Sequence, residues 1–192
     1  VKADSPYKTI EELVAAAKEK GNLKASTNGN KASNHTAAQL LAKSAGFKYK
    51  AIPYGGTADQ LLALRQGEVD FTCAKVADVA KLVKGDKPEL RVLAVFNTKR
   101  DPELPNVPTL GEKGLYPEWY GSARALVAPK GTKPEVIQYY VEAFKKTMQD
   151  PAVIEAHKKA GMALDFKDNK ELGDLIKAQD KFARDVVNDL YK

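Results

Sequence analysis

The sequence predicts an α/β fold in which helices flank a parallel or mixed β-sheet. The first 97 residues alternate strand and helix patterns at short spacing, an order typical of strands that are connected by helices. The composition, with 43% hydrophobic and 29% charged residues, is that of a globular protein. The length of 192 residues leaves room for one ordinary domain or two small lobes.

Four helices are expected in this first part. Thr9 and Glu12 form the pattern of a capping box, so the first helix should begin after Thr9, and Gly21 should end it. Thr57 is expected to cap the third helix and Gly67 to end it. The expected ranges are 10–20, 33–44, 58–66 and 76–84.

Strands are expected between these helices, and the last of them is strongly apolar. Their ranges are 23–27, 49–54, 69–73 and 91–96, and the first residues of the chain read as the end of a further strand. The chain begins with neither an initiator methionine nor the pattern of a secretory signal, so we interpret it as a fragment or a processed product.

The second half of the chain has a different pattern. Pro102, Pro105 and Pro108 predict an ordered connecting loop, residues 122–128 predict a buried strand, and a helix is expected from Pro134. One or two strands cannot cover several amphipathic helices, so we expect this half of the chain to form an incomplete lobe whose apolar faces are covered by another chain or a missing fragment. The clearest amphipathic face comes last and consists of Leu172, Leu175, Ile176, Phe182, Val186 and Leu190.

The composition excludes several kinds of site. A single cysteine rules out an internal disulfide and a cysteine-based zinc cluster. The two histidines, His35 and His157, are too few for a histidine-rich metal site, so neither a metal nor an organic cofactor is expected. The sequence contains no apolar run approaching the roughly 18 residues that a membrane-spanning helix needs.

The net charge of +6 is compatible with a partner that is nucleic acid, anionic lipid or a small acidic ligand, and equally with solvated helix faces. Basic residues are spread along the helices beside acidic ones rather than clustered with aromatic residues, which favours solvated faces, and no nucleic-acid partner is expected. The sequence also lacks a phosphate-binding loop, a Gly-x-Gly-x-x-Gly fingerprint and a Gly-x-Ser-x-Gly elbow. With no acid–base pair or activated nucleophile, we expect a binding protein and not an enzyme.

Two loops form the candidate binding site. One spans residues 26–35 and the other residues 54–57, and each follows a strand and precedes a helix. In a parallel sheet both would lie at the carboxyl ends of the strands, where the helix N-termini attract anions. Glycines permit close backbone approach and hydroxyls suit a carboxylate. The candidate ligand-binding residues are Ser26, Thr27, Asn28, Gly29, Asn30, Ser33, His35, Tyr54, Gly55, Gly56 and Thr57.

The alternative is that both loops are ordinary turns and helix caps. His35 would then have a structural role in the first helical turn instead of contacting a ligand. Cys73 lies in an apolar strand and is expected to be a buried core thiol. Tyr116, Trp119 and Tyr120 mark the crossing between the two parts of the chain, where they either pack in a core or line a pocket.

Several segments carry a family resemblance. The run Leu-Pro-x-Val-Pro-Thr at residues 104–109, followed by Glu-x-Gly at residues 112–114, is the most specific. The other segments are residues 5–13, 25–35, 52–56, 67–70, 93–95, 100 and 128–132. Together they extend over essentially the whole chain, which resembles the substrate-binding proteins of tripartite tricarboxylate transporters, the TctC-like or Bug family.

The resemblance implies a periplasmic binding protein-like fold (type II), in which two lobes of mixed sheet flanked by helices close on a small carboxylate. Residues 7–118 would form the complete second lobe. Residues 1–6 and 119–192 would form part of the first lobe, whose N-terminal portion is absent. The resemblance further implies a periplasmic or extracytoplasmic location, delivery of the ligand to membrane transporter subunits, and a ligand-facing role for both candidate loops.

Three departures from the family pattern concern the ligand. Ala74 stands about where many members carry an aspartate, the second glycine of the ligand loop is replaced near Lys31 and Ala32, and residues 84–90 form a longer stretch than usual. A lysine near the loop favours a dianion, within a class that spans di- and tricarboxylates and aromatic or amino acid carboxylates. The rival functions are a ligand-sensing domain of a regulator or receptor, and an enzyme on the same fold.

Overall fold

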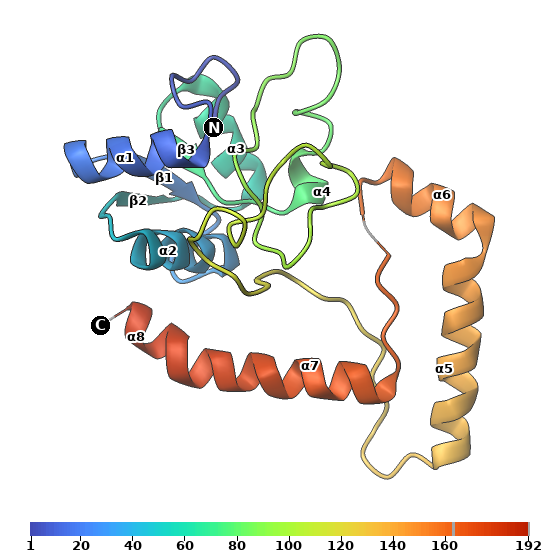
Figure 1. Ribbon diagram of the computed structural model, residues 1–192. Coiled ribbons are helices and arrows are strands. Elements are labelled where there is room, and N and C mark those ends of the chain that lie inside the picture. The colour runs from blue at the N-terminus through green and yellow to red at the C-terminus, as the bar shows by residue number, and fades with distance from the viewer. Residues whose placement is uncertain (163, 192) are drawn as a thin grey trace. The chain divides into compact units, whose positions relative to one another are not determined.

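The computed structural model describes residues 1–162 and 164–191 (Figure 1). The chain divides into two compact units, Val1–Ser122 and a second that begins at Ala123. The sequence-based assignment of residues 7–118 to a complete lobe, and of residues 1–6 and 119–192 to a partial one, stays a prediction. In the described part of the chain, no helix combines the length and apolar character needed to cross a membrane.

The helices of the first unit confirm most of the local predictions. Thr9 and Glu12 form the predicted capping box of the first helix, and Gly21 and Gly67 end their helices in the left-handed conformation, at φ 65° and 78°. Thr57 is not a cap, contrary to the prediction, because the N-cap position is occupied by Gly56 and Thr57 is the first helical residue. The helices are α1 (Ile10–Lys20), α2 (Ser33–Ala45), α3 (Thr57–Gln66) and α4 (Val76–Val79).

The helix predicted for residues 76–84 is wrong in length. It ends at Val79, and the chain then turns back so that the carbonyl of Leu82 accepts hydrogen bonds from the amides of Glu89 and Leu90, at 2.8 and 3.0 Å. This turn replaces the last part of the predicted helix.

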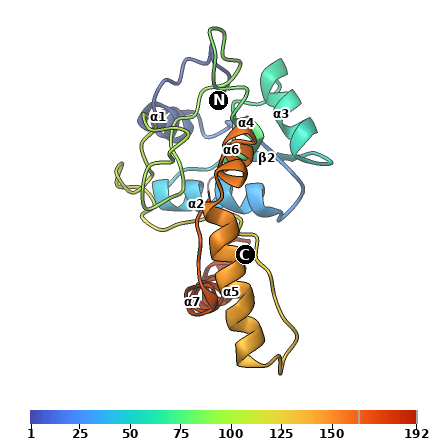
Figure 2. The same ribbon diagram turned by 90° about the vertical axis from the view of Figure 1, so that its right-hand side faces the viewer.

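The sheet of the first unit has three parallel strands in the order β2-β1-β3. Side chains alternate between its faces, so Ala25 and Phe71 join one core with α1 and α2, whereas Ile52 packs against the second core, which contains Leu64 of α3. In both views the helices α1, α2 and α3 surround this short sheet (Figures 1 and 2). The strands are β1 (Lys24–Thr27), β2 (Lys50–Pro53) and β3 (Phe71–Thr72).

The strand predicted for residues 91–96 is wrong. Val95 forms an isolated parallel bridge with Thr109, and Leu93 and Val95 are buried without joining the three-stranded sheet. Hydrophobic patterning predicts burial here, and the loop that follows supplies it instead of a neighbouring strand: the amide of Val95 donates to Pro108 O and its carbonyl accepts from Leu110 N, both at 3.0 Å.

The second unit is helical, and its predicted strand at residues 122–128 is also wrong. This segment is extended but exposed, and no strand in the described part of the second unit pairs with it, so its backbone groups remain in water. The helices are α5 (Pro134–Gln149, viewed from the side in Figure 2), α6 (Pro151–Lys159), α7 (Asn169–Phe182), a π-helical turn (Ala183–Val187) and α8 (Asn188–Leu190).

The helix ends of the second unit follow their sequence signals. Pro134 lies in the first turn of α5, Asp150 caps α6, and Asp168 and Glu171 form a capping box on α7. The apolar faces of these helices, in contrast, are not covered by the other described elements of the second unit. Among the described side chains of α5, α6 and α7 none is buried, and Tyr139 and Ile176 are 70% and 53% exposed.

Candidate functional site

The two candidate loops leave the same edge of the sheet side by side. β1 and β2 are parallel, with Thr27 opposite Pro53, and the amide of Tyr54 donates to the carbonyl of Thr27 at 2.9 Å. The first loop therefore begins beside the second, at the carboxyl ends of two adjacent parallel strands. In open α/β sheets this edge is where ligands bind.

The first loop is held by its own side chains. Asn28 Oδ1 accepts from the amide of Asn34 at 3.2 Å, and the amide of Lys31 donates to His35 Nδ1 at 2.9 Å. Gly29 has φ 129°, a region that favours glycine. Lys31 has φ 58°, and the family resemblance expects a second glycine near this position. A lysine in the left-handed region costs roughly 1–2 kcal/mol relative to ordinary backbone conformations.

A hydrogen bond to the first loop defines the tautomer of the uncharged His35 ring. Because Nδ1 accepts the Lys31 amide, the uncharged ring carries its proton on Nε2. Burial lowers the pKa of His35 below its ordinary value of 6.5, since the protonated ring is poorly solvated there. His35 thus fixes the loop conformation through one nitrogen and has a donor on the other.

The second loop is shorter and partly exposed. The hydroxyl of Tyr54 donates to Glu68 Oε2 at 3.0 Å, and partial desolvation together with this carboxylate raises the pKa of Tyr54. A side chain on Gly55 would meet the carboxylate of Asp59 at 3.4 Å. Gly56 is fully extended, at φ 176° and ψ −179°, and an added Cβ would meet nothing within 4 Å. The conformation of Gly56 is therefore one that any residue can adopt.

Each loop leads into a helix whose N-cap residue lacks a hydrogen-bonding side chain. These residues are Ala32 for α2 and Gly56 for α3. The first amides of a helix have no partner within that helix, and the helix dipole places partial positive charge at the same end. Two such ends beside one another can attract an anion more strongly than either could alone.

The structure separates the predicted site residues by depth. Asn30 and Gly55 are exposed; Asn28, Gly29, Ser33, Tyr54, Gly56 and Thr57 are half-buried; Ser26, Thr27 and His35 are buried. The hydroxyl of Ser26 donates to the carbonyl of Gln60 at 3.0 Å, and that of Thr27 donates to the carbonyl of Gly29 at 3.3 Å. These two hydroxyls already hold the loops from beneath.

Sequence analysis missed the polar residues under the loops. Gln60 is completely buried, and its side chain contacts Asn34 in α2 and Thr72 in β3. The available signal was its position on α3: Gln60 precedes Leu64 by four residues, so both lie on the same inward face. A glutamine on an apolar helix face indicates a buried hydrogen-bonding role.

Cys73 and the aromatic residues at the crossing, for which the sequence also made predictions, lie in the same unit as the two loops. Desolvation raises the pKa of the Cys73 thiol to about 12, and the residue packs against the first core as expected, but it is half-buried and follows β3 instead of lying within a strand. At the crossing, Tyr116 and Tyr120 both make edge-to-face contacts with Phe96. The hydroxyl of Tyr120 also donates to the carbonyl of Ser33 at 3.2 Å, so this aromatic residue reaches the start of α2.

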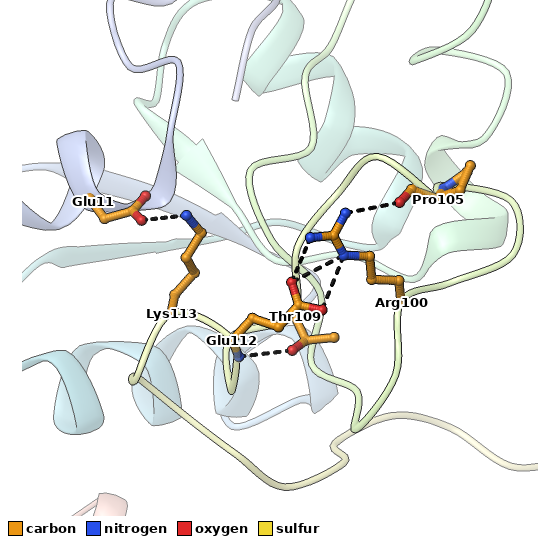
Figure 3. A network of polar contacts seen from close by, with 6 residues as sticks. All are labelled: Glu11, Arg100, Pro105, Thr109, Glu112 and Lys113. Atoms are coloured by element: carbon orange, nitrogen blue, oxygen red, sulfur yellow. Dashed lines mark hydrogen bonds and ion pairs between the residues drawn. The ribbon is translucent and has the colours of Figure 1, made fainter.

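The most specific sequence motif has a structural role (Figure 3). Arg100 contacts both carboxylate oxygens of Glu112 at 2.8–3.1 Å and donates to the carbonyl of Pro105 at 3.2 Å. Lys113 pairs with Glu11 of α1 at 2.6 Å. Hydrogen bonding from Arg100 lowers the pKa of Glu112. These contacts brace the proline-rich loop and tie it to α1. In the described residues, no group of three or more His, Cys, Asp or Glu side chains is arranged to hold a metal.

A family model described as "Tripartite tricarboxylate transporter family receptor", TctC, matches residues 1–190. The chain belongs to this family. One TctC relative, the UPF0065 protein in the gbd 5′ region of Cupriavidus necator, is 38% identical over 152 residues, which are 79% of this chain and 45% of the relative. Protein BugT of Bordetella pertussis is 29% identical over 77% of this chain and 45% of its own length.

Solved structures have the same TctC fold. A TctC solute-binding protein from Polaromonas, crystallised without ligand, matches with a TM-score of 0.87 and 28% identity over 98% of this chain and 64% of its own. MatC from Rhodopseudomonas palustris, with bound malate, has a TM-score of 0.70 and 20% identity over 100% of this chain and 64% of its own. The chain thus spans about half of these curated relatives and less than two thirds of these solved structures.

Proposed function

We propose that this TctC-family chain is part of an extracytoplasmic solute-binding protein that captures a small carboxylate for a tripartite tricarboxylate-type secondary transporter. The observation that supports the proposal is the hydrogen bond between Tyr54 and Thr27, which joins two loops that each lead into a helix N-terminus. In this proposal the protein is located in the periplasm, binds its ligand between two lobes without turning it over, and delivers it to membrane subunits.

The ligand carboxylate would accept hydrogen bonds from the amide of Ser33, the first residue of α2, and from the first amides of α3, whereas the amide of Asn34 already donates to Asn28. Asn28, Asn30, Ser33 and Thr57 are the partly or fully exposed side chains beside these amides that can add further hydrogen bonds. Each charge-assisted hydrogen bond contributes about 1.5–3 kcal/mol. We assign the buried residues Ser26, Thr27 and His35 to the same site as supports that set the loop conformation.

Within the carboxylates, we propose a dicarboxylate. Lys31 adds a positive charge to the exposed part of the first loop, which favours a dianion over a monoanion. A solved relative contains malate and another, also from Rhodopseudomonas palustris, contains adipate, both of which are dicarboxylates. We also propose that the exposed apolar faces of α5, α6 and α7 are covered by another chain or by a further segment of the full protein.

An NMR titration of the 192-residue chain with malate tests the function. The backbone amides of residues 28–35 and 54–59 are expected to shift together, with a dissociation constant of ~1 mM, or about 4 kcal/mol of binding free energy, because only part of a two-lobed site is present. The neutral diamide of malate is the matched control and is expected to leave these amides unmoved. Malate-induced shifts confined to the Arg100–Glu112 region, or no shift at all, would contradict the proposal.

A further inference from the structure

Gln60 connects the two candidate loops from below. It lies one turn into α3 and has 0% exposure, and its main-chain carbonyl and its side-chain amide contact other elements of the first unit. We propose that Gln60 is a positioning residue that holds both loops in a single arrangement, so that they engage one ligand together. The ligand part of this proposal rests on the proposed function above.

The orientation of the Gln60 amide is fixed by its partners. The carbonyl oxygen of Cys73, 2.7 Å away, can only accept a hydrogen bond, so it identifies the amide nitrogen. The second N–H of the same nitrogen is directed at the hydroxyl of Thr72. The amide oxygen accepts from Asn34 Nδ2 at 2.8 Å. The side chain therefore uses both donors and its acceptor, and reversing the amide would break these contacts.

These contacts join the elements that carry the loops. Thr72 of β3 donates onward to the carbonyl of Ser26 in β1 at 2.8 Å, and Ser26 donates back to the carbonyl of Gln60 at 3.0 Å. On the other side, Asn34 is the second residue of α2, and its amide is held by Asn28 of the first loop. A continuous hydrogen-bonded path thus runs from the first loop to the helix that follows the second.

Burial makes the network selective for one conformation. Ser26 and Gln60 are 0% exposed and Asn34 is 4% exposed, so a broken hydrogen bond leaves a polar group without water to replace its partner. Loops that are already arranged before binding lose less conformational freedom when the ligand arrives. Gln60 should therefore influence ligand affinity without contacting the ligand.

Amide hydrogen exchange in the ligand-free chain tests the connection directly. The probes are the amides of Lys31 and Asn34 in the first loop and of Tyr54 in the second, each of which donates a hydrogen bond in the structure. Gln60→Leu is expected to accelerate exchange at all three by about tenfold or more, and to weaken malate binding by about tenfold. Gln66→Leu, at an exposed glutamine of the same helix, is the matched control and should change neither.

A second variant keeps the test decisive where Gln60→Leu does not fold. Asn34→Ala breaks the contact to α2 alone, so exchange should accelerate at Lys31 and at the amide of residue 34 while Tyr54 stays protected. The positioning role is overturned when Gln60→Leu behaves like Gln66→Leu, or when Asn34→Ala accelerates all three amides equally. If the loop amides of the wild-type chain do not shift when malate is added, the proposed function is overturned. The exchange measurement in the ligand-free chain then still decides whether Gln60 joins the loops.

Discussion

The two units of this chain contain similar helices that differ in what they bury. In the first unit α1 has 11 residues and buries four of them, Ile10, Leu13, Val14 and Ala17. In the second unit α5 has 16 residues with a clear apolar face, and none of them is buried. Amphipathic spacing determines which side of a helix is apolar, but only a sheet or another helix in the right place can cover that side.

The difference in burial between the two units should have its largest effect on stability in the core of the first unit. Phe71 is 2% exposed and Phe144 in α5 is 42% exposed, so the same truncation removes very different amounts of packing. Phe71→Ala is expected to lower the free energy of unfolding of the first unit by about 3–5 kcal/mol. Phe144→Ala should lower the free energy of unfolding of the second unit by about 1 kcal/mol or less.

Urea unfolding measures both variants. The fluorescence of Trp119, the only tryptophan in the sequence, follows the first unit, and far-ultraviolet circular dichroism follows the total helix content. Equal losses for the two variants would show that α5 is packed as tightly in solution as β3, and would remove the contrast.

The exposed faces of the second unit should also affect association. If they need cover, the chain is expected to self-associate as its concentration rises, and Tyr139→Ser combined with Ile176→Ser should weaken association by about 2 kcal/mol or more. Leu62→Ser, at a 45% exposed leucine in the first unit, is the matched control and should leave association unchanged. If analytical ultracentrifugation finds a monomer at every concentration, the proposal that another chain covers the apolar faces of α5, α6 and α7 is contradicted.

The first unit is well packed but has a strained position in its ligand loop. Lys31 has φ 58°, so Lys31→Gly is expected to raise the free energy of unfolding of this unit by up to about 1 kcal/mol. Lys31→Ala retains the backbone conformation and its strain, so it should give no such gain. Unfolding followed by Trp119 fluorescence distinguishes the two, and equal stabilities would mean that the loop relaxes in solution.

The smallest expected effect is a dependence of stability on pH through His35. Its pKa in the folded protein lies below 6.5, so the unfolded chain binds the proton more readily as pH falls. The free energy of unfolding should therefore be unaffected by His35 above pH 6.5 and decrease below it. The pH profile of His35→Gln, compared with that of the wild type, isolates this contribution; parallel profiles below pH 6.5 would refute it.

Local signals in the sequence predicted local structure well. The capping box at Thr9 and the left-handed glycines at Gly21 and Gly67 depend on neighbouring residues alone, so they could be read directly. The strands expected at residues 91–96 and 122–128 failed because a strand needs a partner elsewhere in the chain, which hydrophobic spacing does not specify.

The candidate site shows the same division. Glycines and small polar residues identified both loops, and the rule for parallel sheets correctly brought them to one edge, where Tyr54 contacts Thr27. Gln60 was missed because a buried glutamine and an exposed one look alike in sequence. Only the positions of Asn34 and Cys73 around it show that its polarity is used inside the protein.

The high pKa of Cys73 has a practical consequence for chemical labelling. A thiol whose pKa is about 12 is almost entirely protonated at neutral pH, and only the thiolate reacts quickly with maleimides or iodoacetamides. Cys73 is also the only cysteine in the sequence. A single cysteine introduced at the exposed Asn30 would therefore accept a fluorophore selectively in the unmodified background, and would report on the environment of the first loop.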